Sequence, residues 1–390
     1  MRVLQVSEEH GRYVATMAET ELPVARPGEA LVRVAASGVN RADLSQIAGR
    51  YPPPPGESEI LGLEVSGTIA DTGQPVCALL AGGGHAEYAA VPVGQLLPAP
   101  RALDLVSAAA IPESYITAFV NLALEVGLRR DETVLVHAGA SGMGLAAIQL
   151  AKSYGARVAA TTRTAEKLPA LTAAGADLAI DAGREDAAAT IERCWGPDAV
   201  DVVLDSVGAA TLPGDLRVLR PGGRVILLAT LSGSSAELDI ALLMKKRGRL
   251  IGSMLRGRSR DEKAQIVARF GDEILPAFET GRLRVTIDSV FPPERAAAAF
   301  QRMRENRNTG KILIDWSGVA APGHLRRRYL SVLSSQSCRG GLNTSTSSVS
   351  SSACASWGTL EGMNSTSPAR TTTSLSPSAP IRNLRAPSRM

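Results

Sequence analysis

A glycine-rich stretch in the middle of the chain has the residues to bind a phosphate group. Residues 137–155 read HAGASGMGLAAIQLAKSYG. The glycine spacing is the reverse of the common G-x-G-x-x-G pattern, yet the stretch follows an apolar strand and opens a helix, the context that gives such a motif meaning. Backbone N–H groups at a helix N-terminus bind anions. A tight turn without a ligand is the alternative. The predicted diphosphate cradle consists of Gly139, Ser141, Gly142, Met143 and Gly144.

The end of the next strand bears on which dinucleotide is bound. In an NAD site, an acid about 20 residues further on bonds the ribose 2′-hydroxyl. Here the strand ends in TTRTAEKL (161–168), with no acid at that place. Arg163, with Thr162 and Lys167 near it, has the charge to pair with a 2′-phosphate, although a solvated arginine is the alternative. The sequence therefore favours NADPH.

The elements around this loop alternate between strands and helices. Nearly continuous apolar runs predict strands that are buried on both faces, as in a parallel sheet. A helix over 145–154, with Leu145 and Ile148 on its apolar face, joins the first two. Six such units predict a doubly wound Rossmann domain over about 115–255. The predicted strands are 133–139, 156–163, 177–181, 200–208, 223–229 and 249–255.

The segments before and after the predicted Rossmann domain have other residue patterns. Residues 1–113 carry short β-prone runs such as 31–37 and 87–93 between Gly- and Pro-rich turns, which predicts a small β domain. After the nucleotide domain, 261–280 and 294–306 are predicted helices and 310–315 a closing strand. These pieces do not extend the parallel sheet, which leaves a return to the N-terminal β domain open.

Composition and charge exclude several classes of protein. The 390 residues are 45% hydrophobic and 21% charged, with a net charge of +4, and no apolar leader or membrane span is expected. Eight arginines and one acid give 317–390 a charge of +7, which leaves −3 on the rest and argues against a nucleic-acid partner. This Ser-rich tail is expected to be disordered. It is either a functional segment or an extension produced by a frameshift or by read-through. Four scattered cysteines favour neither a zinc site nor disulfides, and cytoplasmic residence is expected.

Several motifs in order along 1–316 resemble one family. The chain is similar to the zinc-independent NADPH:quinone oxidoreductases of the medium-chain dehydrogenase/reductase superfamily. This resemblance implies a GroES-like β domain (1–114 and 256–316) interrupted by the Rossmann domain (115–255), with the active site between them. It also implies a homodimer through the strand near 249–255. The motifs are NRADL (40–44), LGLE (61–64), AAAIPESYITAF (108–119), HAGASGMGLAAIQLAK (137–152), RLIGSMLRGR (249–258) and NTGKILI (308–314).

The resemblance also assigns site residues. Where zinc-dependent relatives have a Cys and a His, this chain has Asn40 and Leu63, so we expect no metal, because both soft ligands are lost. Asn40 and Tyr51 are expected near the substrate oxygen and the nicotinamide. The further cofactor neighbours that the resemblance implies are Thr117, Ser206, Val207 and Lys311. The chain departs from the family in a shortened loop at 71–75 and in Glu166, which stands where a basic residue is expected.

The expected reaction follows from these assignments. Without a Lewis acid, hydride transfer to a quinone is favoured, because the product anion is delocalised. NADPH-dependent reduction of a 2-alkenal or enone, with Tyr51 as proton donor, is the alternative. A second alternative is a non-enzymatic NADPH-binding scaffold. His137, at a strand end, is expected to be structural.

Overall fold

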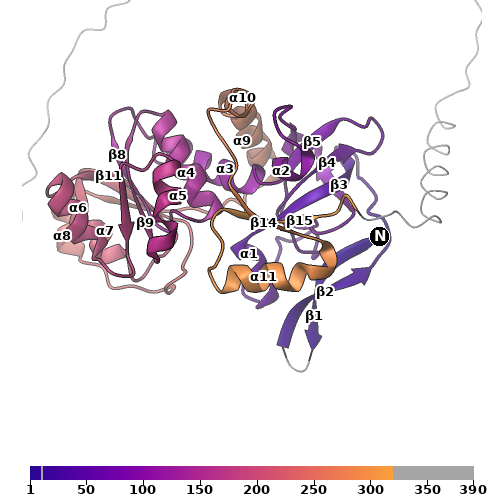
Figure 1. The fold of residues 1–390 in the computed structure, drawn as a ribbon, viewed down its shortest axis with the longest axis horizontal. Coiled ribbons are helices and arrows are strands. Elements are labelled where there is room, and N and C mark those ends of the chain that lie inside the picture. The colour runs from indigo at the N-terminus through magenta and orange to yellow at the C-terminus, as the bar shows by residue number, and fades with distance from the viewer. Residues whose placement is uncertain (10–11, 319–390) are drawn as a thin grey trace, which may run out of the picture. The chain divides into compact units, whose positions relative to one another are not determined.

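The computed structural model of the chain describes residues 1–9 and 12–318. Apart from its first two residues, the tail predicted at 317–390 lies outside the described residues. Two large sheets and one hairpin make up the described strands (Figure 1). The hairpin consists of β1 (Arg2–Glu9) and β2 (Arg12–Glu19).

The first large sheet is parallel and has six strands in the order β10-β9-β8-β11-β12-β13. Numbered from its first strand, this is the order 3-2-1-4-5-6 of a Rossmann domain. The prediction of a doubly wound parallel sheet is therefore confirmed. Its strands are β8 (Thr133–Val136), β9 (Arg157–Thr162), β10 (Leu178–Asp181), β11 (Val200–Asp205), β12 (Leu219–Leu227) and β13 (Arg249–Gly252).

Helices cover both faces of this sheet, as Figure 1 shows. Consecutive residues of β8 alternate between two cores: Val134 packs with Ile148 of α4, whereas Leu135 packs with Ile191 of α6. Burial on both faces explains why the strands read as continuous apolar runs. The flanking helices are α4 (Gly142–Ser153), η3 (Ala165–Lys167), α5 (Leu168–Ala173), α6 (Ala187–Trp195), α7 (Leu212–Val218) and α8 (Ile240–Lys246).

The second large sheet joins strands from the two ends of the described chain. It runs β14-β15-β3-β4-β5-β7, with β6 also pairing with β3. Strand β15 is antiparallel to β3, so the segment after the Rossmann domain does return to the N-terminal β domain. The domain boundaries at 114 and 255 stay predictions. The strands are β3 (Glu29–Val39), β4 (Glu64–Ile69), β5 (Pro75–Leu79), β6 (Tyr88–Pro92), β7 (Leu96–Pro98), β14 (Ile287–Phe291) and β15 (Lys311–Asp315).

Helix α3 (Pro112–Phe119) contributes to the same core as the Rossmann strands, through Ile116 and Phe119.

The helical run Leu105–Glu125 is long and apolar enough to cross a membrane. However, 72% of its most apolar stretch is buried inside the fold, as in the core helix of a soluble protein. The remaining helical segments are α1 (Arg41–Ile47), η1 (Val93–Gln95), α2 (Leu105–Ala108), η2 (Val120–Glu125), α9 (Arg260–Glu273), α10 (Pro276–Glu279), η4 (Pro293–Arg295) and α11 (Ala296–Arg304).

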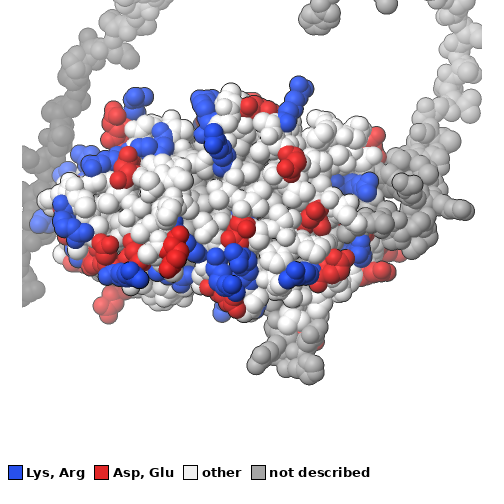
Figure 2. Space-filling model, viewed as in Figure 1, with Lys and Arg blue, Asp and Glu red and all other residues white. Residues whose placement is uncertain are grey.

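The face seen in Figure 2 carries acidic and basic side chains interspersed, without an extended patch of either sign. Surfaces that bind nucleic acid usually carry a stripe of basic residues that pairs with the phosphate backbone. This face has no such stripe. The expectation that the protein has no nucleic-acid partner stays a prediction.

Candidate active site

The glycine-rich loop forms the turn from β8 into α4. Ser141 caps the helix: its Oγ accepts the N–H of Gly144 at 3.0 Å, and the first turn contains no acid. A Cβ at Gly144 would lie 2.5 Å from the carbonyl oxygen of Ala138, so only glycine lets the helix start this close to the loop. The next free N–H groups of the helix end, those of Gly142 and Met143, suit an anion. A dinucleotide diphosphate fits this turn.

The loop is also hydrogen-bonded to the segment that enters β15. The N–H of Gly310 donates to the carbonyl oxygen of Ala140 at 2.9 Å, and Ser141 forms a bridge with Gly310. A Cβ at Gly142 would overlap the stem of Lys311 and lie 3.1 Å from the Oγ of Ser114. The phosphate loop, β15 and the start of α3 therefore meet at one place.

Asn40 and Lys311, both predicted site residues, lie in one buried network with Glu64, which sequence reasoning did not single out. The Nδ2 of Asn40 donates to Glu64 at 2.9 Å and to the carbonyl oxygen of Gly38 at 3.1 Å. The Nζ of Lys311 donates to the Oδ1 of Asn40 at 2.8 Å, to the carbonyl oxygen of Val39 at 3.2 Å and to Glu64. All three ammonium protons of Lys311 are thus used inside the protein, and its direct contact with the cofactor stays a prediction.

Tyr51 lies half-buried beside Arg256, whose guanidinium carbon is 4.9 Å from the ring centroid. Arg256 is itself fixed by the carbonyl oxygens of Ala81 and Tyr51 and by Gln46. Burial raises the pKa of the Tyr51 hydroxyl, and the charge of Glu113 raises it further. The described residues offer that hydroxyl no hydrogen-bond partner. The structure therefore places Tyr51 with a free hydroxyl next to an acid, Glu113, that sequence reasoning missed.

Thr117 lies one helical turn after Glu113 on α3. Its Oγ1 is buried and has no hydrogen-bond partner in the described part of the chain. Buried hydroxyls are usually paired, so this one is a candidate contact for a bound molecule. Its predicted place beside the nicotinamide is consistent with this geometry and stays a prediction.

Basic residues gather where β9 ends, the edge of the sheet that also holds the phosphate loop. The N–H of Gly139 donates to the carbonyl oxygen of Thr161 at 2.7 Å, and the buried Thr162 and the exposed Arg163 follow. Burial and the charge of Arg163 both lower the pKa of Lys167. They act in the same way on Arg41, a residue that sequence reasoning missed although it directly follows Asn40. Three cations, Arg41 of α1, Arg163 just after β9 and Lys167 of η3, are thus close enough to repel one another, which favours binding of an anion.

Ser206 and Val207 follow β11 on the same sheet edge. The buried carboxylate of Asp205 holds this turn by accepting the N–H groups of Val207 at 2.6 Å and Gly208 at 3.1 Å. The Asp205 side chain therefore fixes the backbone of this turn, which follows the strand next to β8. The predicted role of Ser206 and Val207 at the ribose or adenosine is untested.

Two histidines are buried in structural contacts. His137 lies 2.7 Å from Asp215 and 3.0 Å from Thr161. His85 lies 2.7 Å from Ser37 and 3.4 Å from Asp43. The second group resembles a Ser-His-Asp triad in composition, but its serine and histidine are fully buried and the Ser37 hydroxyl is also bonded by Trp316. No substrate reaches it, so neither histidine is a candidate catalyst.

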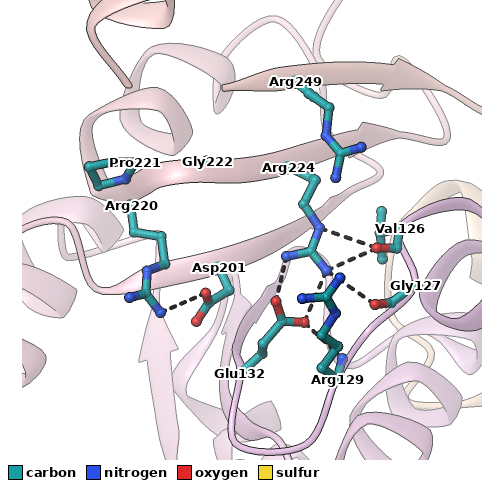
Figure 3. Close-up of a pocket in the computed structure, with 10 residues that line it drawn as sticks. All are labelled: Val126, Gly127, Arg129, Glu132, Asp201, Arg220, Pro221, Gly222, Arg224 and Arg249. Carbon is teal, nitrogen blue, oxygen red and sulfur yellow. Dashed lines mark hydrogen bonds and ion pairs between the residues drawn. The ribbon is translucent and has the colours of Figure 1, made fainter. Parts of the chain in front are cut away.

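A cavity of about 300 Å³ lies at the opposite edge of the parallel sheet, where β8, β11 and β13 begin (Figure 3). Its carboxylates are already paired: Glu132 accepts two hydrogen bonds from Arg224, and Asp201 accepts one from Arg220. This cavity is remote from the phosphate loop and is not the candidate active site. Within residues 1–9 and 12–318, no three His, Cys, Asp or Glu side chains are grouped to hold a metal ion.

Comparisons with known proteins agree with this geometry. The model of the alcohol dehydrogenase GroES-like domain matches residues 26–101, and that of the zinc-binding dehydrogenases matches 142–272. The quinone oxidoreductase of Thermus thermophilus, whose structure includes a complex with NADPH, is 31% identical, with a TM-score of 0.69 over 81% of this chain and 100% of that one. The quinone oxidoreductase of Sus scrofa is 29% identical over 76% of this chain and 92% of its own length.

One relative is much longer than this chain. The spectinabilin polyketide synthase system protein NorB of Streptomyces orinoci is 34% identical over 77% of this chain, which spans 14% of that protein. Together the fold, the phosphate turn and the matches define an oxidoreductase that binds NAD(P)H. The chain belongs to the medium-chain dehydrogenase/reductase superfamily, in its quinone oxidoreductase group.

Proposed function

We propose that the protein transfers a hydride from NADPH to a quinone without a metal ion. The observation that supports this proposal most is the set of hydrogen bonds that Asn40 makes. Its amide is satisfied by Gly38, Glu64 and Lys311, and neither it nor Leu63 supplies the thiolate or imidazole that would hold Zn²⁺. An acceptor whose reduced form is a delocalised anion suits such a site, and the named quinone oxidoreductase relatives support the choice.

In this proposal the nicotinamide supplies the hydride, and the protein positions the acceptor and excludes water. The N-terminus of α4 holds the diphosphate. The start of α3 and Tyr51 line the place where the acceptor lies. The cations Arg41, Arg163 and Lys167 favour the 2′-phosphate of NADPH over the hydroxyl of NADH.

The direct test is oxidation of NADPH by the full-length protein across a panel of quinones and 2-alkenals, with NADH as the control. We expect turnover with quinones and a preference for NADPH. Turnover of 2-alkenals alone would replace the quinone by an activated C=C bond. No turnover with any acceptor, together with NADPH binding, would indicate a non-enzymatic binding protein.

The second candidate function, reduction of an enone, is favoured by the free hydroxyl of Tyr51, which could protonate carbon. We expect Tyr51→Phe to keep quinone turnover within about threefold and to lower enone turnover by about 10²-fold, because only the enone needs a proton on carbon. Initial rates with one quinone and one enone at equal NADPH measure this difference. Equal losses with both acceptors would show that Tyr51 serves binding rather than proton transfer.

We also propose a homodimer formed through β13, the edge strand of the parallel sheet. Ile240 and Met244 of α8, the helix before β13, and Met254, just after β13, are 62%, 71% and 58% exposed, and exposed apolar side chains are typical of an interface. We expect the full chain to sediment as a dimer at micromolar concentration, and Met254→Glu to weaken the dimer by at least tenfold. A monomer at every concentration would contradict this proposal.

A further inference from the structure

Glu113 occupies the first turn of α3, where three parts of the candidate site meet. Its backbone N–H donates to the Oε2 of Glu64 at 2.8 Å, which ties α3 to the network of Asn40 and Lys311. The next residue, Ser114, lies against Gly142 of the phosphate loop. The first turn of α3 therefore lies between the polar network and the loop that fits the diphosphate.

Three polar groups around this turn have no hydrogen-bond partner in the described chain: the Glu113 carboxyl, the Tyr51 hydroxyl and the Thr117 Oγ1. Glu113 and Thr117 share one face of α3, because they are four residues apart. Tyr51 is close enough for the charge of Glu113 to raise its pKa. Half-buried polar groups that the protein leaves unpaired next to one another suit a ligand with a polar atom.

The surroundings of Glu113 favour its protonated form. Burial, together with the charges of Glu64 and Asp43, raises the pKa of Glu113 to about 8. Lys311 and Lys263 lower it, but Lys311 is already bound by Glu64. The other groups that face it are Tyr51 and Arg256. At neutral pH the carboxyl therefore carries a proton that it can give up.

We propose that Glu113 is the proton donor of the reaction, an inference that rests on the proposed function. The hydride would leave a C–H bond of the nicotinamide and bring its hydrogen and two electrons to the acceptor, which leaves a negative charge on the acceptor oxygen. The O–H bond of the Glu113 carboxyl breaks, and its proton forms the new O–H bond of the hydroquinone. Water then reprotonates the carboxylate. Glu113 is thus a catalytic residue that contacts the acceptor oxygen.

The test compares wild type, Glu113→Gln and Glu113→Asp over a series of quinones whose hydroquinones differ in acidity. Gln keeps the size of the side chain but has no acidic proton. We expect kcat/KM of Glu113→Gln to fall about 10²- to 10⁴-fold for the least acidic hydroquinones and much less for the most acidic ones. Wild-type kcat/KM should fall about tenfold per pH unit above the pKa of Glu113, about 8, whereas that of Glu113→Gln should be flat. Glu113→Asp restores part of the rate and the pH dependence.

Two controls separate this role from a structural one. Glu192 lies half-buried on α6 and pairs with Arg217 of α7, so Glu192→Gln should change neither the rate nor the pH profile. NADPH affinity, measured by fluorescence, should be the same in all variants. A uniform loss with every quinone, or a pH decline that persists in Glu113→Gln, would overturn the role of Glu113.

A measurement that needs no turnover can test the role of Glu113 separately from the proposed function. Infrared titration of the cofactor-free protein should show a carboxyl C=O band that disappears as the pH passes the pKa of about 8 in wild type and is missing in Glu113→Gln. Absence of that band in wild type would contradict the inference, whatever the activity. If the band is present but wild type reduces no quinone, the proposed function fails and the role of Glu113 in it falls as well.

Discussion

Replacing Lys311 by methionine is expected to lower the free energy of unfolding by about 3–5 kcal/mol, because it leaves the fully buried carboxylate of Glu64 without its cation. Methionine has nearly the same length, so the stem beside Gly142 stays filled. Urea denaturation of the full chain, followed by tryptophan fluorescence and circular dichroism, measures the change. A loss below about 1 kcal/mol would show that Glu64 is neutral or solvated in the folded protein.

The double variant Glu64→Gln/Lys311→Met is the matched control for this prediction. It removes both charges while a neutral amide still accepts from the Nδ2 of Asn40. Removing both partners of a buried ion pair costs much less than removing one. We therefore expect the double variant to recover most of the lost stability. If it is as unstable as Lys311→Met, packing of the lysine stem and not its charge is the cause.

Replacing Arg163 by alanine is expected to reduce the preference for NADPH over NADH by about 10- to 100-fold. A hydrogen bond to a charged group is worth about 1.5–3 kcal/mol. The substitution removes this bond to the 2′-phosphate of NADPH, whereas NADH has no 2′-phosphate and loses nothing. The change should appear in KM for NADPH, with KM for NADH nearly constant. Steady-state kinetics with both cofactors, and the salt dependence of KM, provide the measurement.

Arg193→Ala is the control for this substitution, because Arg193 is an exposed arginine of α6 that pairs with Glu185. It should leave both KM values unchanged. If Arg163→Ala leaves the preference intact, Arg41→Gln should be measured next, since Arg41 lies in the same cation cluster. An unchanged preference in both variants, or an NADH preference in wild type, would contradict the assignment of NADPH.

Much of the Rossmann domain could be predicted because its signals are local. All six strand runs from 133 to 255 overlap a strand of the parallel sheet, since burial on both faces imposes continuous apolar sequence. Strand ends were less accurate: the run at 200–208 ends as β11 at Asp205, because Asp205 folds back to accept the N–H groups of its own turn. The run at 223–229 begins earlier, as β12 at Leu219.

The candidate site was predicted less completely, for a physical reason. Asn40 and Lys311 were named from motifs, but their shared partner Glu64 depends on β4 and β15 both lying beside the end of β3. Glu113 is an ordinary acid in AAAIPESYITAF, and its raised pKa arises from burial and from carboxylates on other elements. The residues next to Glu113 in the sequence indicate neither its burial nor its raised pKa.

The sequence by itself determined the parallel sheet, the glycine-rich turn from β8 into α4 and the absence of an acid at the end of β9, because each depends on residues close together in the chain. Tertiary structure alone decided that β15 pairs with β3 across more than 270 residues, and so brings Lys311 to Asn40 and Glu64. It also decided which charges are buried together. The raised pKa of Glu113 and the repulsion among Arg41, Arg163 and Lys167 follow from distances in space, which local sequence does not encode.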